Sequence, residues 1–306
     1  MSAPSALHSV ASRLLPRACV AAVIRDYVAL TRPRVLSLVL FTAPPALLLG
    51  QPGWPSPGTI AGVLLGAALI GAGCGALNAW IEIETDGVME RTRNRPLPTG
   101  RLAPRQALAF GLAISALGLL VLYVGCGGLA AAIGALTLAY YVFVYTLWLK
   151  PRTPQNIVLG GAAGAASPLI ADAAIDGRLG IWGLVLFAIV FLWTPPHFWA
   201  IALYRKREYE AAGFPMMPSV VGDEATRRRM AVYAIALIPV TLLPWLSGSL
   251  SVVYVVTALI LGGGFLASIG RAMRLRRPQQ DRRVFGFSIL YLATLFAEML
   301  LELTLF

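Results

Sequence analysis

Long uncharged stretches dominate this sequence and limit what it can fold into. A helix that crosses the hydrocarbon core of a bilayer, about 30 Å thick, needs about 20 consecutive apolar residues. Nine windows of roughly this length carry few or no charges. They cover residues 35–51, 58–81, 106–125, 128–149, 156–175, 180–203, 230–247, 251–270 and 285–306. The sequence therefore predicts an all-α, polytopic membrane bundle of about nine transmembrane helices.

The composition excludes the usual soluble classes. Hydrophobic residues make up 58% of the 306 residues and charged residues only 13%, whereas soluble domains carry about 25% charged residues. A net charge of +11 would suit a nucleic-acid-binding protein, but such proteins keep their basic residues on a water-exposed domain, which these windows leave no room for. We therefore expect no nucleic-acid partner, and interpret the charge as attraction to anionic lipid headgroups.

Basic residues fall in alternate gaps between the windows. They occur before the first window and in the second, fourth, sixth and eighth gaps, and only Arg178 lies in another gap. Because cytoplasmic loops collect Lys and Arg, the N-terminus is predicted to be cytoplasmic and the C-terminus outside. Residues 1–25 are expected to form a cytoplasmic lead-in and residues 26–306 a single transmembrane domain. The lead-in has no clear signal-peptide core. It is also short and poorly formed as a mitochondrial presequence, which favours a bacterial inner (plasma) membrane, with the mitochondrial inner membrane as the alternative.

Polar residues at a regular spacing mark the end of the second window. Asn78, Glu82, Asp86 and Glu90 follow one another at intervals of four, so they lie on one face of a helix. Crowded carboxylates need a compensating cation. Mg²⁺ is suited to this role because it binds carboxylate oxygens and completes its shell with water and phosphate oxygens. The alternative is a solvated helix end whose acids pair with the arginines that follow.

Cations surround this acidic segment in the sequence. The string RTRNRP starts at Arg91, and further basic groups end the fourth window, at Lys150 and Arg152, and the sixth, at Lys206. Guanidinium groups bind phosphate oxygens in pairs. A prenyl diphosphate would use both environments, because its tail prefers hydrocarbon by about 0.8 kcal/mol per CH₂ while its head needs a metal and cations.

Five strings, in order, carry a resemblance to a known family. They are DYVALTRPRVLSLVLFTA from Asp26, RTRNRPLPTG from Arg91, TPQNIVLGGAAGAASPLI from Thr153, TPPHFWAIAL from Thr194 and AGFPMMP from Ala211. With the acidic segment, they resemble the membrane prenyltransferase (UbiA) superfamily and, within it, the family of protoheme IX farnesyltransferases, or heme O synthases, of heme biosynthesis. The strings span residues 26–220, and the hydropathy extends the likeness to the end of the chain.

The resemblance implies a Mg²⁺-dependent reaction. A farnesyl group would pass from farnesyl diphosphate to a vinyl group of heme B, with addition of water, to give heme O and diphosphate. Asn78, Glu82 and Asp86 would be the catalytic residues and bind the Mg²⁺, although Glu82 stands where the superfamily signature has Asp. Glu208 is a further candidate metal ligand, in a segment that matches the superfamily's second acidic motif poorly.

The resemblance also assigns substrate contacts. The implied diphosphate contacts are Arg91, Arg95, Lys150, Arg152 and Lys206. His197, beside the prolines of TPPHFW, is a candidate heme contact, with a hydrogen bond to a carbonyl freed by those prolines as the alternative. The implied partners are heme B, farnesyl diphosphate and the lipid bilayer, with heme A synthase or cytochrome oxidase assembly proteins as protein partners.

Two other functions stay open from the sequence. As a different member of the superfamily, the chain would transfer a prenyl group to an aromatic or quinone precursor. A membrane transporter would also contain many apolar windows. Transporters place their ionisable groups near the bilayer midplane, however, whereas here acids and bases gather at one predicted membrane face, which favours an enzyme.

Overall fold

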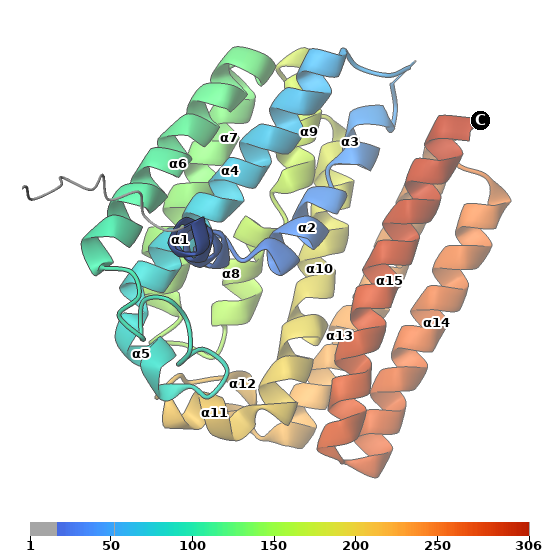
Figure 1. Cartoon of the computed structure of the whole chain (residues 1–306). Helices are drawn as coiled ribbons and strands as arrows, with labels where there is room; N and C mark the ends of the chain where they lie inside the picture. Colours follow the sequence, from blue (N-terminus) through green and yellow to red (C-terminus); the bar gives the residue numbers. More distant parts are fainter. Residues whose placement is uncertain (1–16, 52, 306) are drawn as a thin grey trace, which may run out of the picture.

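The computed structural model describes residues 17–51 and 53–305, and every regular element in this part of the chain is a helix (Figure 1). The elements are α1 (Arg17–Leu30), α2 (Pro33–Phe41), α3 (Pro44–Leu48), α4 (Pro57–Ile81), α5 (Ile83–Val88), α6 (Pro104–Cys126), α7 (Gly128–Ala139), the π-helix η1 (Tyr140–Leu149), α8 (Asn156–Gly164), α9 (Ser167–Asp176), α10 (Ile181–Tyr204), α11 (Lys206–Ala211), α12 (Met217–Val221), α13 (Asp223–Leu242), the 3₁₀ helix η2 (Leu243–Ser247), α14 (Val252–Leu275) and α15 (Pro278–Leu305). Residues 1–16 of the predicted lead-in and Phe306 lie outside the described residues.

Within the described ranges, eight helical units are long and apolar enough to cross a membrane. Three of them are composite: Gly128–Leu149 joins α7 to η1, Asn156–Asp176 joins α8 to α9, and Asp223–Ser247 joins α13 to η2. Figure 1 shows the long helices side by side, whereas α1 is seen end-on and so lies across them. The predicted all-α membrane bundle is confirmed.

The first predicted span, residues 35–51, is not a single transmembrane helix. It contains most of α2 and all of α3, and its apolar part, Val35–Leu48, is shorter than a crossing requires. Pro44 and Pro45 lack the amide hydrogens that a continuous helix needs. The nine predicted spans therefore become eight long helical units and one broken apolar segment.

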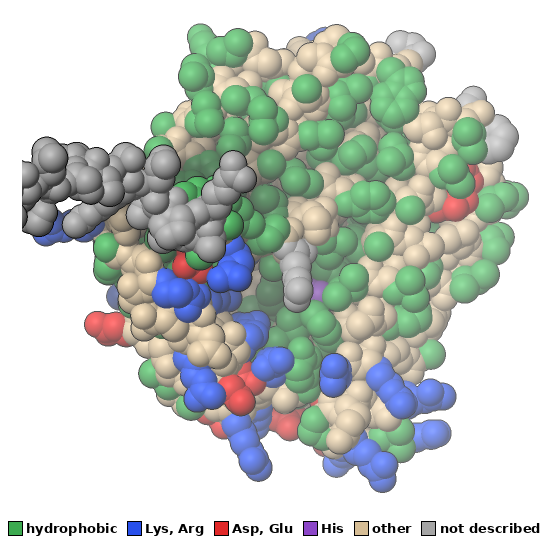
Figure 2. Space-filling model, viewed as in Figure 1, with side chains coloured by type: hydrophobic (Ala, Val, Ile, Leu, Met, Phe, Trp, Pro, Cys, Tyr) green, Lys and Arg blue, Asp and Glu red, His purple; other side chains and the backbone are tan. Residues whose placement is uncertain are grey.

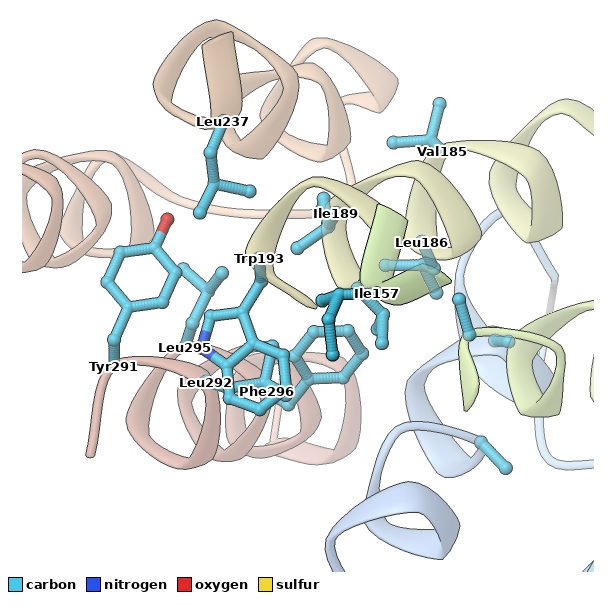
Figure 3. Close-up of a cluster of buried hydrophobic side chains, with 14 of the residues drawn as sticks. Ile157, Val185, Leu186, Ile189, Trp193, Leu237, Tyr291, Leu292, Leu295 and Phe296 are labelled. Carbon is cyan, nitrogen blue, oxygen red and sulfur yellow. The ribbon is translucent and has the colours of Figure 1, made fainter. Parts of the chain in front are cut away.

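The second proline pair behaves differently. Pro195 and Pro196 lie inside α10, which continues through them to Tyr204. α10 also forms the centre of the bundle, and Figure 3 shows Trp193 lying against Leu292 and Phe296 of α15. Neighbouring helices thus surround the segment in which the prolines remove backbone hydrogen bonds, which is the setting in which membrane helices tolerate proline.

α4 and α6 approach each other closely through glycines. A Cβ atom built at Gly66 would lie 2.5 Å from Cδ2 of Leu122. A Cβ atom built at Gly118 would lie 2.9 Å from Cβ of Leu69 and 3.0 Å from the backbone nitrogen of Ile70. Small residues let membrane helices come this close, and the contact fixes the helix whose end carries the polar residues Asn78, Glu82 and Asp86.

We expect Gly118→Ala to lower the free energy of unfolding by about 1–3 kcal/mol, because its methyl group would meet the backbone of α4. Gly263 of α14 has no heavy atom within 4 Å of a built Cβ atom, so Gly263→Ala is the matched control and should be neutral or slightly stabilising. Thermal unfolding of the purified proteins in detergent measures both. Equal melting temperatures for the two variants would contradict the proposed close contact.

Candidate active site

Charged side chains gather at one end of the bundle. Figure 2 shows most of the Lys, Arg, Asp and Glu side chains of this face crowded over its lower end, below a largely hydrophobic surface. In Figure 1 this end holds the C-terminus of α4 and the short helices α5, α11 and α12. Because ionisable groups are costly in hydrocarbon, a molecule with a charged head and an apolar tail can satisfy both parts at this boundary.

Asn78, Glu82 and Asp86 share one face across the junction of α4 and α5. The junction keeps the helical hydrogen bonds, since the amide of Glu82 donates to the carbonyl of Asn78 at 3.0 Å and the amide of Asp86 to that of Glu82 at 2.8 Å. All three residues are buried, with exposed fractions of 0%, 7% and 4% in chain order. Glu90, expected on the same face, lies beyond the end of α5 and is exposed. We call Asn78, Glu82 and Asp86 the acid face.

Each member of the acid face is engaged by a different cation. The three pairs are Arg32 with Asn78, Lys150 with Glu82 and Arg95 with Asp86. Arg95 donates Nη1 to Oδ2 of Asp86 at 2.7 Å. The three cations come from the turn before α2, the residue after η1 and the loop after α5, so the pairs join three parts of the chain.

Burial changes the acidity of these cations. It lowers the pKa of the Lys150 ammonium, which the nearby Glu82 carboxylate opposes. It also lowers the pKa of Arg95, and the positive charge of Arg32 acts in the same direction. Both cations have given up water and stand close to other positive charge, so an additional anion at this place would be favoured.

The π-helix η1 fixes the Asn78 amide from the opposite side. The Thr146 hydroxyl donates to the carbonyl of Tyr141, five residues earlier, at 2.8 Å, which is the spacing of a π-turn. The same hydroxyl accepts a hydrogen bond from Nδ2 of Asn78 at 3.1 Å. With Nδ2 used in this way, Oδ1 is the amide atom presented to cations.

The arginine-rich loop after α5 is anchored at several points. Thr92 donates its hydroxyl hydrogen to the carbonyl of Asp86 at 2.7 Å. Arg101 donates Nε to both carboxylate oxygens of Asp26, in α1, at 3.2 Å. Arg91 hydrogen-bonds to Tyr209 of α11, whose pKa is raised by burial and lowered to a smaller extent by this arginine. The loop therefore connects α1, the acid face and α11.

Three other predicted site residues have partners outside the acid face. It pairs Arg152 with the carbonyls of Leu147 and Trp148, Lys206 with Asp223, and Glu208 with Arg205. Oε2 of Glu208 is buried and has no hydrogen-bond partner. Of the predicted diphosphate contacts, Arg95 and Lys150 pair with the acid face, whereas Arg91 lies near Arg95 and bonds Tyr209. The roles of these residues and of Arg152, Lys206 and Glu208 stay predictions.

His197 lies inside α10 among aromatic rings. Its ring stacks on Trp193 with a centroid distance of 4.2 Å and lies 4.8 Å from the ring of Phe285. Its Nδ1 is 2.6 Å from Oγ of Ser288, and that hydroxyl donates its hydrogen to the carbonyl of Phe285 at 2.7 Å. With the Ser288 hydrogen on this carbonyl, the matching tautomer of His197 donates from Nδ1 to Ser288 and has its lone pair on Nε2.

The acid face has the donor atoms that a hard cation prefers. An amide oxygen and two carboxylates suit Mg²⁺, which binds through one or two carboxylates and shares its shell with substrate phosphates. Mg²⁺ has six ligand positions, and the acid face offers three side chains. These residues therefore fit a metal that is held jointly with a diphosphate.

Three residues of this cluster are missed by the sequence analysis. Arg32 stands in the TRPR string that carries part of the resemblance, but the sequence marks it only as one of the basic residues before the first span. Thr146 and Tyr209 give no signal of their own, because their contacts with Asn78 and Arg91 join segments far apart in the chain.

Comparison with known proteins gives the same family that the sequence strings indicate. The model of the UbiA prenyltransferase family matches residues 39–295. The protoheme IX farnesyltransferase of Brucella ovis is 48% identical over 286 residues, which cover 91% of this chain and 90% of that protein.

Solved structures share the fold. A digeranylgeranylglyceryl phosphate synthase has a TM-score of 0.76 at 14% identity, covering 92% of this chain and 98% of that one. A UbiA homolog from Archaeoglobus fulgidus, bound to DMAPP and Mg²⁺, has a TM-score of 0.61 at 16% identity, covering 89% of this chain and 99% of that one.

We expect Thr146→Val to lower the free energy of unfolding by about 1–3 kcal/mol, because it leaves the buried Nδ2 of Asn78 without its acceptor. Thr137→Val is the matched control, since the Thr137 hydroxyl bonds only the carbonyl of Ile133 in its own helix. Thermal unfolding in detergent compares the two variants. A loss no greater in Thr146→Val than in Thr137→Val would show that the contact with Asn78 does not stabilise the protein.

Proposed function

The chain belongs to the UbiA prenyltransferase family and is a prenyltransferase, and on this basis we propose that it transfers the farnesyl group of farnesyl diphosphate to a vinyl group of heme B, giving heme O. The observation that supports farnesyl diphosphate as the donor is the acid face with its three cations, which lies at the boundary between the charged end and the apolar bundle. The name of the Brucella ovis relative, 48% identical, supports heme B as the acceptor.

Binding of the donor divides between two sets of side chains. Asn78, Glu82 and Asp86 would hold a Mg²⁺ ion, which supplies positive charge to the diphosphate when bound. Arg95 and Lys150, which pair with the acid face, and Arg91, which lies near Arg95, would contact the diphosphate oxygens directly, since they can donate several hydrogen bonds. The farnesyl chain would extend into the apolar bundle.

The first step breaks the bond between C1 of the farnesyl group and the diphosphate oxygen. The electron pair leaves with the diphosphate, and Arg95 and Lys150 stabilise the negative charge that develops there. These cations are partly desolvated, so their charge acts on the leaving group more strongly than it would in water. The apolar surroundings keep water away from the allylic cation.

The second step forms a carbon–carbon bond without a nucleophilic side chain. The π electrons of the heme vinyl group attack C1 of the farnesyl cation, which moves the positive charge to the vinyl carbon next to the porphyrin ring. Water adds to that carbon and loses a proton to the solvent, which leaves a hydroxyl group. The products are a hydroxyethylfarnesyl porphyrin and diphosphate.

His197 is the proposed contact to the acceptor. The hydrogen bonds among His197, Ser288 and Phe285 leave Nε2 with a lone pair, and a histidine that ligates a metal commonly donates its other ring nitrogen in this way. An iron porphyrin could therefore be oriented through its iron by Nε2, or through its edge by the neighbouring aromatic rings.

The proposal includes a setting for the enzyme. The charged end would face the cytoplasm of a bacterial cell, with residues 26–306 as one domain in the inner membrane, because loops rich in Lys and Arg stay on that side. Heme A synthase or oxidase assembly proteins, which would receive the product, are the proposed protein partners.

The direct test is to incubate purified protein in detergent with heme B, farnesyl diphosphate and Mg²⁺, with and without a chelator, and to measure porphyrin masses. We expect a Mg²⁺-dependent product heavier than heme B by a farnesyl group and water. If folded protein forms no such product but farnesylates an aromatic acceptor, the assignment of heme B is wrong. Failure with both acceptors would mean that this prenyltransferase uses another acceptor.

We expect Asp86→Asn to reduce farnesyl transfer by about 100-fold or more, since the variant loses a carboxylate that would hold the metal against the leaving group. Glu84→Gln, on the same short helix but exposed, is the matched control and should keep its activity. Product formation per folded protein measures both. Full activity of Asp86→Asn would exclude the metal role.

For His197→Leu we expect weaker binding of heme B, because Nε2 is lost. Ser288→Ala should weaken binding by about 10- to 100-fold, the usual effect of removing the partner that orients a metal ligand, whereas Ser288→Thr keeps the hydroxyl and should bind normally. Titration of heme B, followed by its visible absorption spectrum in the absence of farnesyl diphosphate, measures this. Unchanged spectra and affinities in His197→Leu would rule out iron ligation by His197.

A further inference from the structure

One oxygen of each residue in the acid face is bonded to a cation of the protein itself, so a metal on the other carboxylate oxygens would stand beside these cations. Arg32 donates to Oδ1 of Asn78, the only oxygen of that amide. The Lys150 ammonium is bonded to Oε1 of Glu82. Arg95 takes Oδ2 of Asp86 in the same way, so a metal cannot reach this set without displacing or crowding positive charge.

These pairs neutralise the acid face inside the protein. Glu82 and Asp86 are at least nine-tenths buried, and an uncompensated buried charge is strongly destabilising. The cations are also shielded, since the Lys150 side chain is 15% exposed and that of Arg95 30%. Separating a pair therefore leaves a buried carboxylate and a partly buried cation without partners. The carboxylate then needs another cation, and the cation needs another anion.

The turn that leads into α2 holds Arg32 in this arrangement. Its backbone has φ of 52° and ψ of 56°, a left-handed conformation that is unfavourable for residues other than glycine, asparagine and aspartate. Its carbonyl accepts the amides of Val35 and Leu36 at the start of α2, at 3.0 and 3.2 Å. The turn thus aims the Arg32 guanidinium at Asn78 and fixes α2 at the same time.

A metal ion or a diphosphate alone meets an unfavourable site. The metal would separate the cations from the acid face and give them no anion in exchange, and its own charge would repel them. A diphosphate would bind the cations and leave two buried carboxylates without partners. When both ligands arrive, the carboxylates receive the metal and the cations receive the phosphate oxygens.

We propose that Arg32, Lys150 and Arg95 are exchangeable counter-ions of the acid face, which pair with it until metal and diphosphate bind and then move to the diphosphate, so that the two ligands load together. The proposal rests on the proposed function only in taking a metal–diphosphate pair as the ligand. It adds Arg32 to the diphosphate-binding residues. It also means that the free metal is a poor ligand of this protein.

The test measures metal binding without turnover. The full chain in detergent is titrated with Mn²⁺, a paramagnetic substitute for Mg²⁺, and free Mn²⁺ is followed by electron paramagnetic resonance, with and without inorganic diphosphate. A titration without protein corrects for the Mn²⁺–diphosphate complex. We expect diphosphate to tighten Mn²⁺ binding by about 10-fold or more, which corresponds to about 1.4 kcal/mol of coupling.

The decisive result is the sign of the effect in Lys150→Met. Removal of this cation frees Oε1 of Glu82, so Mn²⁺ alone should bind more tightly than to the unchanged protein, by about 10-fold, while the gain from diphosphate should shrink. Arg95→Met, which frees Asp86, should shift both quantities in the same directions and is the second variant if Lys150→Met does not fold. Arg93→Met removes an exposed cation of the same loop and should change neither quantity.

Three outcomes are separable. If Lys150→Met and Arg95→Met bind Mn²⁺ alone no more tightly than the unchanged protein, the cations are not counter-ions of the metal site and the proposal is wrong. Equal Mn²⁺ affinity with and without diphosphate in the unchanged protein would also overturn it. Coupled binding of Mn²⁺ and diphosphate without farnesylated heme would support the counter-ion exchange and reject the proposed acceptor.

Discussion

Buried charge at the end of α4 has to be neutralised inside the protein, and much of the arrangement around it follows from this requirement. Glu82 and Asp86 lie where the apolar bundle meets its charged end, with too little water to solvate them. Each therefore has its own cation, and the neutral amide of Asn78 has a third. Since unpaired buried charges are strongly destabilising, these contacts fix the positions of the turn before α2, the residue after η1 and the loop after α5.

The scaffold makes such pairing possible by holding helices at short distances. Glycines in α4 and α6 remove the side chains that would keep the two helices apart, so the long helix that ends at the acid face is held firmly along its length. The π-helix η1 adds local geometry, because its wider turn lets Thr146 bond both Tyr141 and Asn78. The packing of α4 against α6 thus determines how precisely the acid face is positioned.

The charged boundary and the apolar interior suit the two substrates of the proposed reaction, the prenyl diphosphate and the heme. Cations and carboxylates at the boundary suit a metal and a diphosphate, while α10 brings His197 and aromatic rings into the interior. A prenyl diphosphate bound at the boundary would direct its reactive carbon toward the interior. The bundle therefore separates charge stabilisation from the apolar space in which the carbon–carbon bond would form.

Sequence alone determined the class of fold and the acid face. Apolar window length predicted the membrane bundle, because every crossing helix must be long and uncharged, and spacing by four residues predicted one face for Asn78, Glu82 and Asp86, because helical periodicity is local. The same reasoning failed at residues 35–51, where window length gave a span although Pro44 and Pro45 divide it. Glu90 was also misplaced, since the end of α5 depends on how the following loop packs.

Tertiary structure alone decided which cation meets which acid. Arg32 and Asn78 are 46 positions apart and Lys150 and Glu82 are 68 apart, so no local pattern relates them, and Arg152 resembled Lys150 in sequence although its guanidinium caps backbone carbonyls. The hydrogen bond that sets the free nitrogen of His197 likewise comes from Ser288, on another helix. Charge and spacing identify candidate groups, but their pairing depends on distances that only the packed bundle fixes.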